Sequence, residues 1–120
     1  MQTPLQITFH GLDHSDAIEE RIREKAAKLE QIYDRIIGCR VVIEVRHRNA
    51  NTEHRKGEPF HIAIDLSVPG AKLVVKNAPK DSHANEDILV ALREAFDNLE
   101  RQLKDFVTRQ RTDVKARAAQ

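Results

Sequence analysis

Lysine and arginine recur along residues 84–111, at spacings that could serve phosphate binding. A helix turns by about 100° per residue, so the residue spacing decides which side chains share a face. The basic residues that fall close together on one such face are Arg93, Arg101, Lys104 and Arg111. A row of cations attracts phosphate by Coulomb attraction and counterion release. The alternative is an ordinary solvated helix face, in which acids at i,i+4 pair with the cations.

A second basic row is expected in an earlier helix, over residues 16–33. Its members on one flank of the apolar face are Arg21, Lys25, Lys28 and Arg35. If both helices pack side by side on a sheet, the two rows would border a common groove and attract phosphate. The acids that favour the solvated-face interpretation are Glu24, Asp97, Glu100 and Asp105. Periodicity leaves both interpretations open.

The polar stretch of residues 46–58 is a long basic loop between two expected strands. Its cations are Arg46, Arg48, Arg55 and Lys56. Loops beyond about 12 residues are usually either functional or disordered. The loop is therefore either a clamp on an anion or a hydrophilic connection.

Histidines and the cysteine offer other chemistry, which we considered and set aside. His10 and His14 lie near Asp13 and Asp16, and a metal-dependent enzyme could use them. However, no pair has the spacing that fixes a rigid metal site on a helix, so we expect solvated histidines and no metal or cofactor. Cys39 stands at a strand entrance and is expected to be a small, semi-buried residue. Without a catalytic constellation, we expect a protein that is not an enzyme.

Alternating apolar residues predict four strands, over residues 5–9, 41–45, 60–68 and 73–75. Pro69-Gly70 predicts a tight turn between the last two strands. Asp13, Ser15 and Asp16 are possible N-caps of the first helix, and Gly38 is its expected stop, with Ile36 continuing its apolar face.

The expected order is β-α-β-β-β-α, an α+β fold with two helices on one face of a mostly antiparallel four-stranded sheet. The helical crossover makes the first two strands a candidate parallel pair. The other sheet face would show Arg40, Glu44, Arg46, His61, Asp65, Lys72 and Lys76. Residues 1–112 form the expected domain, and residues 113–120 a flexible C-terminal tail.

Composition narrows the class of protein. No apolar run is long enough for a membrane span, no signal peptide is evident, and the single cysteine requires no oxidising compartment, so a cytoplasmic protein is expected. The formal net charge is only +1, so a polyanion site must come from the arrangement of charges. The four phenylalanines fall at expected core positions, which predicts that any RNA partner is structured and bound through its backbone.

Several segments together resemble one known family. The matching residues are Ile7-Thr8, Ser15, Ala17-Ile18, Ala27-Lys28-Leu29-Glu30, Glu86-Asp87-Ile88-Leu89-Val90-Ala91-Leu92 and Leu99-Glu100-Arg101-Gln102-Leu103. In this order they span about residues 5–111 and resemble the ribosome hibernation promoting factor family, also called ribosome-associated inhibitors or subunit-interface proteins. Each motif alone is common, whereas their joint order and spacing are specific.

The resemblance implies a double-stranded-RNA-binding-like domain that binds the small ribosomal subunit and its ribosomal RNA near the decoding centre. Such a factor blocks mRNA and tRNA binding and shelters idle ribosomes under stress or in stationary phase. By motif position, Lys25, Lys28 and Arg101 match basic residues of the family that meet RNA phosphates, and we extend this set along the helices and the loop. The full expected RNA-binding set is Arg21, Lys25, Lys28, Arg48, Arg55, Lys56, Arg93, Arg101, Lys104, Arg109 and Arg111.

The sequence also departs from the family pattern. Leu89 replaces a common tyrosine, Asn98 and Asp105 stand where lysine is common, and the 46–58 loop is longer. Long members carry a further C-terminal domain that pairs ribosomes, so ribosome pairing by this chain alone is not expected. We expect a monomer when free, with no DNA or membrane partner. The alternative function is a small protein-binding stress or transcription modulator that uses the exposed sheet face and the 46–58 loop.

Overall fold

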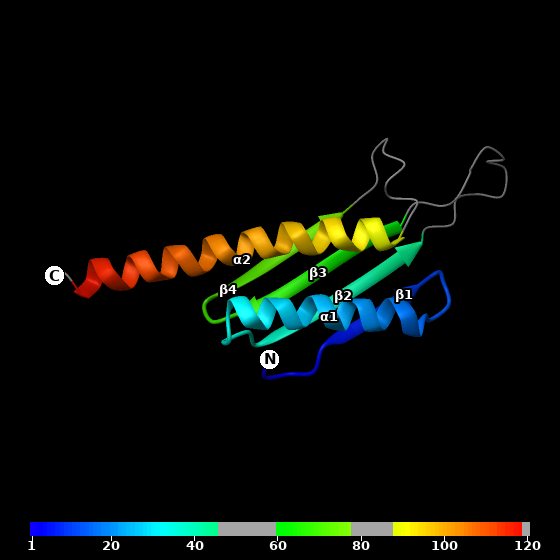
Figure 1. The fold of residues 1–120 in the computed structure, drawn as a ribbon, viewed down its shortest axis with the longest axis horizontal. Coiled ribbons are helices and arrows are strands. Elements are labelled where there is room, and N and C mark those ends of the chain that lie inside the picture. Colours follow the sequence, from blue (N-terminus) through cyan, green and yellow to red (C-terminus); the bar gives the residue numbers. More distant parts are fainter. Residues whose placement is uncertain (46–59, 78–87, 119–120) are drawn as a thin grey trace.

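The computed structural model describes residues 1–45, 60–77 and 88–118, and of Phe60, Asn77 and residues 112–118 the backbone only. The elements are β1 (Gln6–His10), α1 (Asp16–Ile32), β2 (Gly38–Val45), β3 (Phe60–Val68), β4 (Ala71–Asn77) and α2 (Ile88–Ala118). Four strands form one sheet in the order β1-β2-β3-β4, and both helices lie along one side of it (Figure 1). The predicted α+β fold and element order are confirmed. The basic loop, with Arg46, Arg48, Arg55 and Lys56, lies outside the described residues.

Strand pairing follows from the connections. β1 and β2 are parallel, with Ile7 opposite Val41, because α1 carries the chain back along the sheet between them. β2, β3 and β4 are successively antiparallel. Gly70 has φ 82°, a left-handed conformation that glycine adopts without a Cβ penalty, and it makes the predicted tight turn between β3 and β4.

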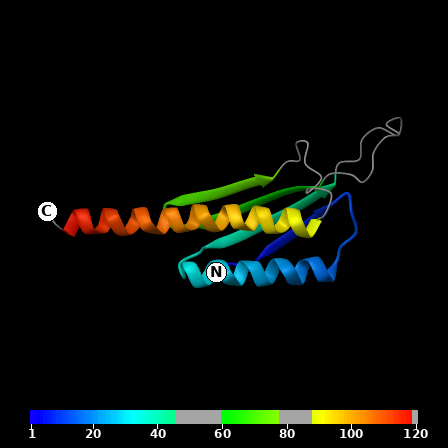
Figure 2. The ribbon, with the colours of Figure 1, turned by 45° about the horizontal axis from the view of Figure 1, so that its top comes forward.

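Burial alternates along the strands as a half-covered sheet requires. On β3, Ile62, Ile64, Leu66 and Val68 are buried, and the residues between them are only partly covered. The residues that share the opposite sheet face include Arg40, Glu44, His61, Asp65, Lys72 and Lys76, as predicted. This side of the sheet has no covering layer in the described part of the chain (Figure 2).

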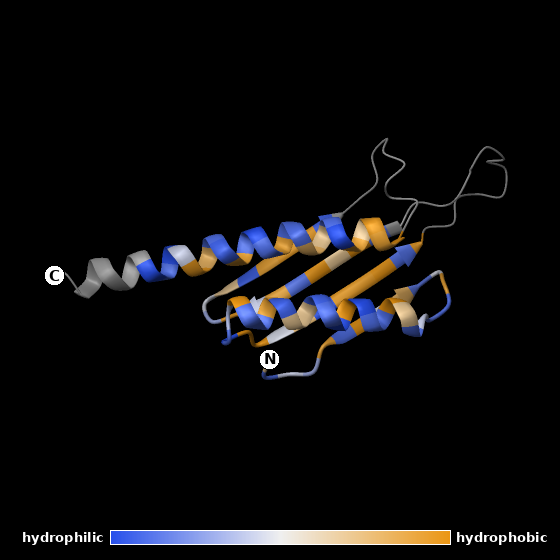
Figure 3. Cartoon of the chain, viewed as in Figure 1, coloured by the Kyte–Doolittle hydropathy of each residue, from blue (hydrophilic) through white to orange (hydrophobic). Residues whose placement is uncertain are grey.

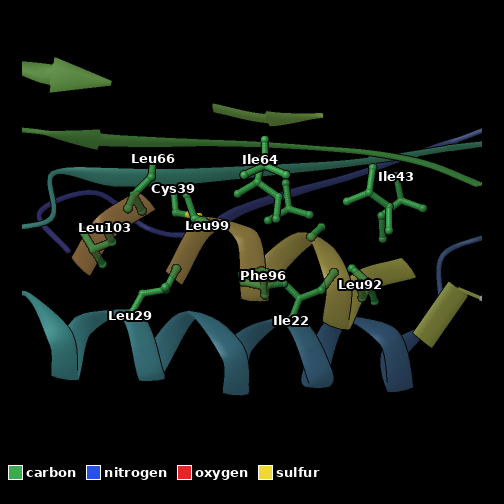
Figure 4. Packing of buried hydrophobic residues seen from close by; sticks show 14 of the residues in the cluster. Ile22, Leu29, Cys39, Ile43, Ile64, Leu66, Leu92, Phe96, Leu99 and Leu103 are labelled. Atoms are coloured by element: carbon green, nitrogen blue, oxygen red, sulfur yellow. The ribbon is translucent and has the colours of Figure 1, made fainter. Parts of the chain in front are cut away.

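The core lies between the sheet and the two helices. Ile22 and Leu29 from α1 point toward the sheet beside α2 residues, as Figure 4 shows. The α2 contribution comprises Ala91, Leu92, Ala95, Phe96, Leu99 and Leu103, all buried. Their spacing of three and four places them on one stripe of the helix. Hydrophilic residues recur along the opposite, visible side of both helices (Figure 3).

The boundaries of α1 differ in part from prediction. Ser15 is the N-cap, and its side chain accepts a 3.3 Å hydrogen bond from the Ile18 amide. The helix ends at Ile32, with Tyr33 extended as the C-cap, so the prediction that Gly38 stops the helix is wrong. Gly38 instead begins β2, and Ile36 is buried in the connection, so it does not continue the helical face.

The second helix continues past residue 112, the expected end of the domain. It begins at Ile88 and continues to Ala118, which places most of the predicted tail, residues 113–120, in helical backbone. Alanine, lysine and arginine dominate residues 115–119, and all three favour helix. At about 1.5 Å per residue, the 31 residues of α2 span roughly 46 Å, against roughly 25 Å for the 17 of α1. Figures 1 and 2 both show α2 extending past the sheet and past α1.

Candidate nucleic-acid interface

The first helix presents one basic flank toward the second helix. Both helices start at the same end of the sheet and run side by side in the same direction (Figures 1 and 2). Ile32 lines a hollow together with Val107 of α2, so its flank of α1 faces α2. Arg21, Lys25 and Lys28 precede Ile32 at spacings of four, three and four residues, which places them on that same flank.

The second helix has a basic flank that faces the first helix. Val107 and Arg111 line the same hollow, so their stripe of α2 faces α1. Arg93 and Lys104 belong to this stripe, at i−14 and i−3 from Val107. We call the facing flanks of the two helices the interhelical basic surface; it comprises Arg21, Lys25, Lys28, Arg93, Lys104 and Arg111.

The interhelical basic surface carries a net positive charge, and its cations are not paired. Five of its six cations are exposed and Lys25 is half-buried. On the described parts of these two flanks the carboxylates at i±3, i±4 or i±7 from these cations are those of Glu24, Asp97 and Glu100. Ion pairs between side chains of the described residues instead join Arg23 to Glu19 and Lys72 to Asp65, with His14 contacting two further carboxylates. The six cations therefore have no described carboxylate within 4 Å to neutralise them.

Two predicted RNA-binding residues lie elsewhere. Arg101 lines a small hollow with Val75 and Lys76 of β4, on the outer side of α2. Arg109 follows Gln102 by seven residues, and Gln102 donates a hydrogen bond to the Val74 carbonyl oxygen at 3.3 Å, so this stripe faces β4. The structure thus brings six members of the predicted set together and separates Arg101 and Arg109 from them. The loop members Arg48, Arg55 and Lys56 lie outside the described residues.

A cluster of His14, Asp16 and Glu19 gathers at the start of α1, with ligand-type atoms within 4.8 Å of one another. His14 Nε2 lies 2.8 Å from Glu19 Oε2 and His14 Nδ1 lies 3.4 Å from Asp16 Oδ1. Arg23 donates a 2.8 Å hydrogen bond to Glu19, and this bond, followed by the one with His14, lowers the pKa of Glu19. Carboxylates at a helix N-terminus interact favourably with its dipole, so the cluster is explained as an N-terminal charge network.

Cys39 is 4% exposed, as a core residue would be. Burial, with a smaller contribution from the charge of Asp65, raises the pKa of its thiol to about 12. The thiolate is the reactive form of cysteine, so this site disfavours nucleophilic chemistry.

One feature was missed by sequence reasoning. A hollow of about 580 Å³, here called the Tyr33 hollow, opens where α1 ends against α2. Its lining residues are Gln31, Ile32, Tyr33, Asp34, Arg35, Val107, Gln110 and Arg111. Arg35 was expected on a helix flank, but α1 ends before it. A tyrosine between an early helix end and an arginine is the signal that could have indicated this site.

The family model described as Sigma 54 modulation protein / S30EA ribosomal protein matches residues 5–111. The chain belongs to this family. The resemblance to ribosome hibernation promoting factors is thereby confirmed.

Two proteins that are similar to this chain in sequence are named as ribosome hibernation factors. The chain is 30% identical over 104 residues to the "Ribosome hibernation promotion factor" of Deinococcus radiodurans, covering 87% of this chain and 49% of that protein. It is also 30% identical over 99 residues to the "Ribosome hibernation promoting factor" of Azotobacter vinelandii, covering 82% and 78%. The chain thus spans about half the length of the Deinococcus relative and most of the Azotobacter one.

Solved structures share the fold. A ribosomal subunit interface protein from Coxiella burnetii superposes with a TM-score of 0.67 at 16% identity, covering 87% of this chain and 97% of that one. The N-terminal domain of Protein Y from Thermus thermophilus gives 0.63 at 23% identity, covering 87% and 99%. Neither α1 nor the described part of α2 combines the length and apolar composition that crossing a membrane requires.

Proposed function

We propose that this protein is a non-enzymatic ribosome hibernation factor of the cytoplasm. In this proposal it binds ribosomal RNA of the small subunit near the decoding centre and sterically blocks mRNA and tRNA under stress or in stationary phase. Family membership and the names of the two relatives support a ribosomal role. The observation that carries the RNA contact is the interhelical basic surface, where six cations outnumber three carboxylates on two adjoining flanks and none of the six has a described carboxylate within 4 Å.

The proposed contact is with phosphate oxygens of folded RNA. Lys28 and Lys104 stand on opposing flanks, so a backbone lying along the seam between the helices would meet cations from both sides. Each phosphate neutralised releases counterions, and affinity should fall steeply with salt. If roughly five to eight phosphates are neutralised, the log–log slope of affinity against salt is about −4 to −7.

Co-sedimentation with purified small subunits through a sucrose gradient tests this proposal. The double variant Lys28→Glu, Lys104→Glu reverses one charge on each flank and should abolish co-sedimentation. The matched control Arg40→Glu, Lys76→Glu changes net charge equally on the uncovered face of the sheet and should sediment as wild type does. Circular dichroism of both variants shows whether the fold is kept. Undiminished binding by the folded Lys28, Lys104 variant would remove the interhelical surface from the proposal.

Steric blocking requires a second measurement. Small subunits preloaded with the protein should bind less labelled mRNA and initiator tRNA, in proportion to the protein bound. Occupied subunits that accept mRNA and tRNA normally would leave a ribosome-binding protein without the proposed inhibitory action.

The proposal also includes a monomeric free protein, which should migrate as a monomer in size-exclusion chromatography.

A second candidate function rests on the uncovered sheet face. Val74 is 39% exposed there, among charged neighbours on β2, β3 and β4. A protein partner, such as a transcription regulator, could contact this face. Capture of a partner that survives nuclease and high salt, and that Arg40→Glu, Lys76→Glu abolishes, would favour this function over RNA binding.

A further inference from the structure

The Tyr33 hollow combines an apolar floor with a cationic rim. Ile32, Tyr33 and Val107 are half-buried there, whereas Arg35 and Arg111 are exposed. It stands at the far end of the interhelical basic surface, where α2 extends beyond α1 (Figure 1). The volume of about 580 Å³ falls within the usual range for small-ligand sites.

The aromatic platform of the hollow is held in place. Tyr33 leaves the helix as its extended C-cap, and its amide donates to the Leu29 carbonyl oxygen at 3.0 Å. Its hydroxyl donates a 3.3 Å hydrogen bond to Oε1 of Gln110 on α2. Its ring meets the Phe106 ring edge-on, with centroids 5.8 Å apart. Contacts to both helices therefore hold this side chain in place, and of these partners only Gln110 also lines the hollow.

Two cations stand on different elements around this platform. Arg35 comes from the connection after α1, and Arg111 from the overhanging part of α2. Neither has an ion pair with a described residue, and Asp34 is the one carboxylate among the lining residues. A guanidinium group binds phosphate oxygens through paired N–H donors. The amides of Gln31 and Gln110 add donors and acceptors beside the apolar floor.

We propose that the Tyr33 hollow is a nucleotide subsite, which takes one unpaired nucleotide of an RNA with its base over Tyr33 and its phosphate between Arg35 and Arg111. This subsite rests on the proposed function and adds a contact to a base, which the backbone contacts along the helices lack. A free inorganic anion would leave the apolar floor unused. An acidic peptide would leave the aromatic ring of Tyr33 and the side-chain amides of Gln31 and Gln110 without a matching group.

The chain contains one tyrosine and no tryptophan, so the ring protons of Tyr33 form a single, readily assigned NMR signal set. The probe is adenosine 5′-monophosphate, titrated into the full chain. Ribose 5-phosphate and inorganic phosphate are the matched probes without a base. Stacking of a base should shift the Tyr33 ring signals and make binding at least about tenfold tighter than that of ribose 5-phosphate. No shift, or equal affinity for the two sugar phosphates, overturns the proposal.

Variants separate the phosphate contact from the fold. Arg35→Ala should weaken adenosine 5′-monophosphate binding severalfold, whereas Arg40→Ala, an exposed arginine on the far sheet face, should leave it unchanged. Equal binding by wild type and Arg35→Ala contradicts the assigned phosphate position.

Ribosome co-sedimentation of the same wild-type sample keeps the two proposals distinguishable. Sedimentation without a Tyr33 shift removes the subsite and keeps the proposed function. A Tyr33 shift without sedimentation removes that function, and with it the RNA as occupant of the hollow.

Discussion

Thr3 Oγ1 lies only 2.5 Å from the point that a Cβ on Gly38 would occupy. The same oxygen donates a 3.0 Å hydrogen bond to the Ile37 carbonyl oxygen, and the Thr3 amide donates to it at 2.9 Å. The segment before β1 is thus fastened to the start of β2 where β2 has no side chain. The φ of Gly38 is not in the left-handed region, so its backbone conformation does not require glycine. The close approach of Thr3 does, because it leaves no room for a Cβ.

Gly38→Ala should therefore destabilise the protein, because the new methyl group collides with Thr3. Overpacking of this kind typically costs about 1–3 kcal/mol. Thr3→Ala removes the colliding oxygen, and in that background Gly38→Ala should cost much less. Urea denaturation of wild type, both single variants and the double variant measures the coupling. The same loss from Gly38→Ala in both backgrounds would show that backbone freedom, and not this contact, selects glycine.

Cys39 should resist alkylation in the folded protein. Burial raises the pKa of its thiol from 9.0 to about 12, so at pH 8 its thiolate fraction is roughly a thousandfold below that of an unperturbed thiol. Iodoacetamide labelling followed by mass spectrometry should be negligible in buffer and complete in denaturing urea. Rapid labelling of the native state would indicate that the β2 entrance opens frequently.

The sign of the linkage for this thiol follows from the same raised pKa. Below about pH 9 the thiol is protonated in both the folded and the unfolded state, and its contribution to the free energy of unfolding is fully present. As the pH rises between 9.0 and about 12, the unfolded chain loses the proton first, and the stability contributed by this group declines. Cys39→Ala should remove this part of the alkaline decline, in thermal melts recorded across that range.

The sequence was sufficient for the fold because its signals are local and repeated. Apolar residues alternate along Phe60–Val68, which predicts one buried sheet face. Apolar residues recur at spacings of three and four from Ile88 to Phe106, which predicts one buried helix face, and the two faces cover each other in the core. The end of α1 was mispredicted because Ile36 continues the apolar spacing without continuing the helix. Its side chain reaches the core from an extended connection, which periodicity cannot distinguish from another helical turn.

The candidate site was predictable only in part. Spacing along one helix was enough to group Arg21, Lys25 and Lys28 on one flank of α1, because a stripe depends on one helix alone. Which side of α2 faces α1 depends on how the helices pack, so Arg101 and Arg109 were grouped with residues that the structure places on another flank. The Tyr33 hollow is formed by the end of α1 and the part of α2 that extends beyond it. The pattern of one sequence segment does not predict how two such parts meet.

Glu19→Gln should change the acid stability of the protein. Hydrogen bonds from Arg23 and then from His14 lower the pKa of the Glu19 carboxyl from its usual 4.5. A lowered folded-state pKa contributes stability that is fully present above the unfolded value and is lost as the pH falls through the folded value. Wild type should therefore melt above Glu19→Gln at pH 7, with a difference that shrinks below pH 4.5. Asp13→Asn serves as a control with an exposed neighbouring carboxyl.

A melting difference that persists unchanged to acid pH would mean that the charge of Glu19 is not what stabilises the start of α1. The Glu19 side chain is only partly covered, so the effect should also weaken as salt is added.

Lys104 and Arg109 offer the sharpest test of how α2 meets RNA. Both are exposed cations on the same helix, but Lys104 belongs to the interhelical basic surface and Arg109 to the stripe that faces β4. Removal of one phosphate contact lowers the salt slope by about one unit and weakens binding about equally for all RNA sequences. Lys104→Ala should do this in titrations with small subunits at several salt concentrations, and Arg109→Ala should not. If Arg109→Ala lowers the slope and Lys104→Ala leaves it intact, the RNA lies along the β4 side of α2, beside Arg101, and the assigned surface is the wrong one.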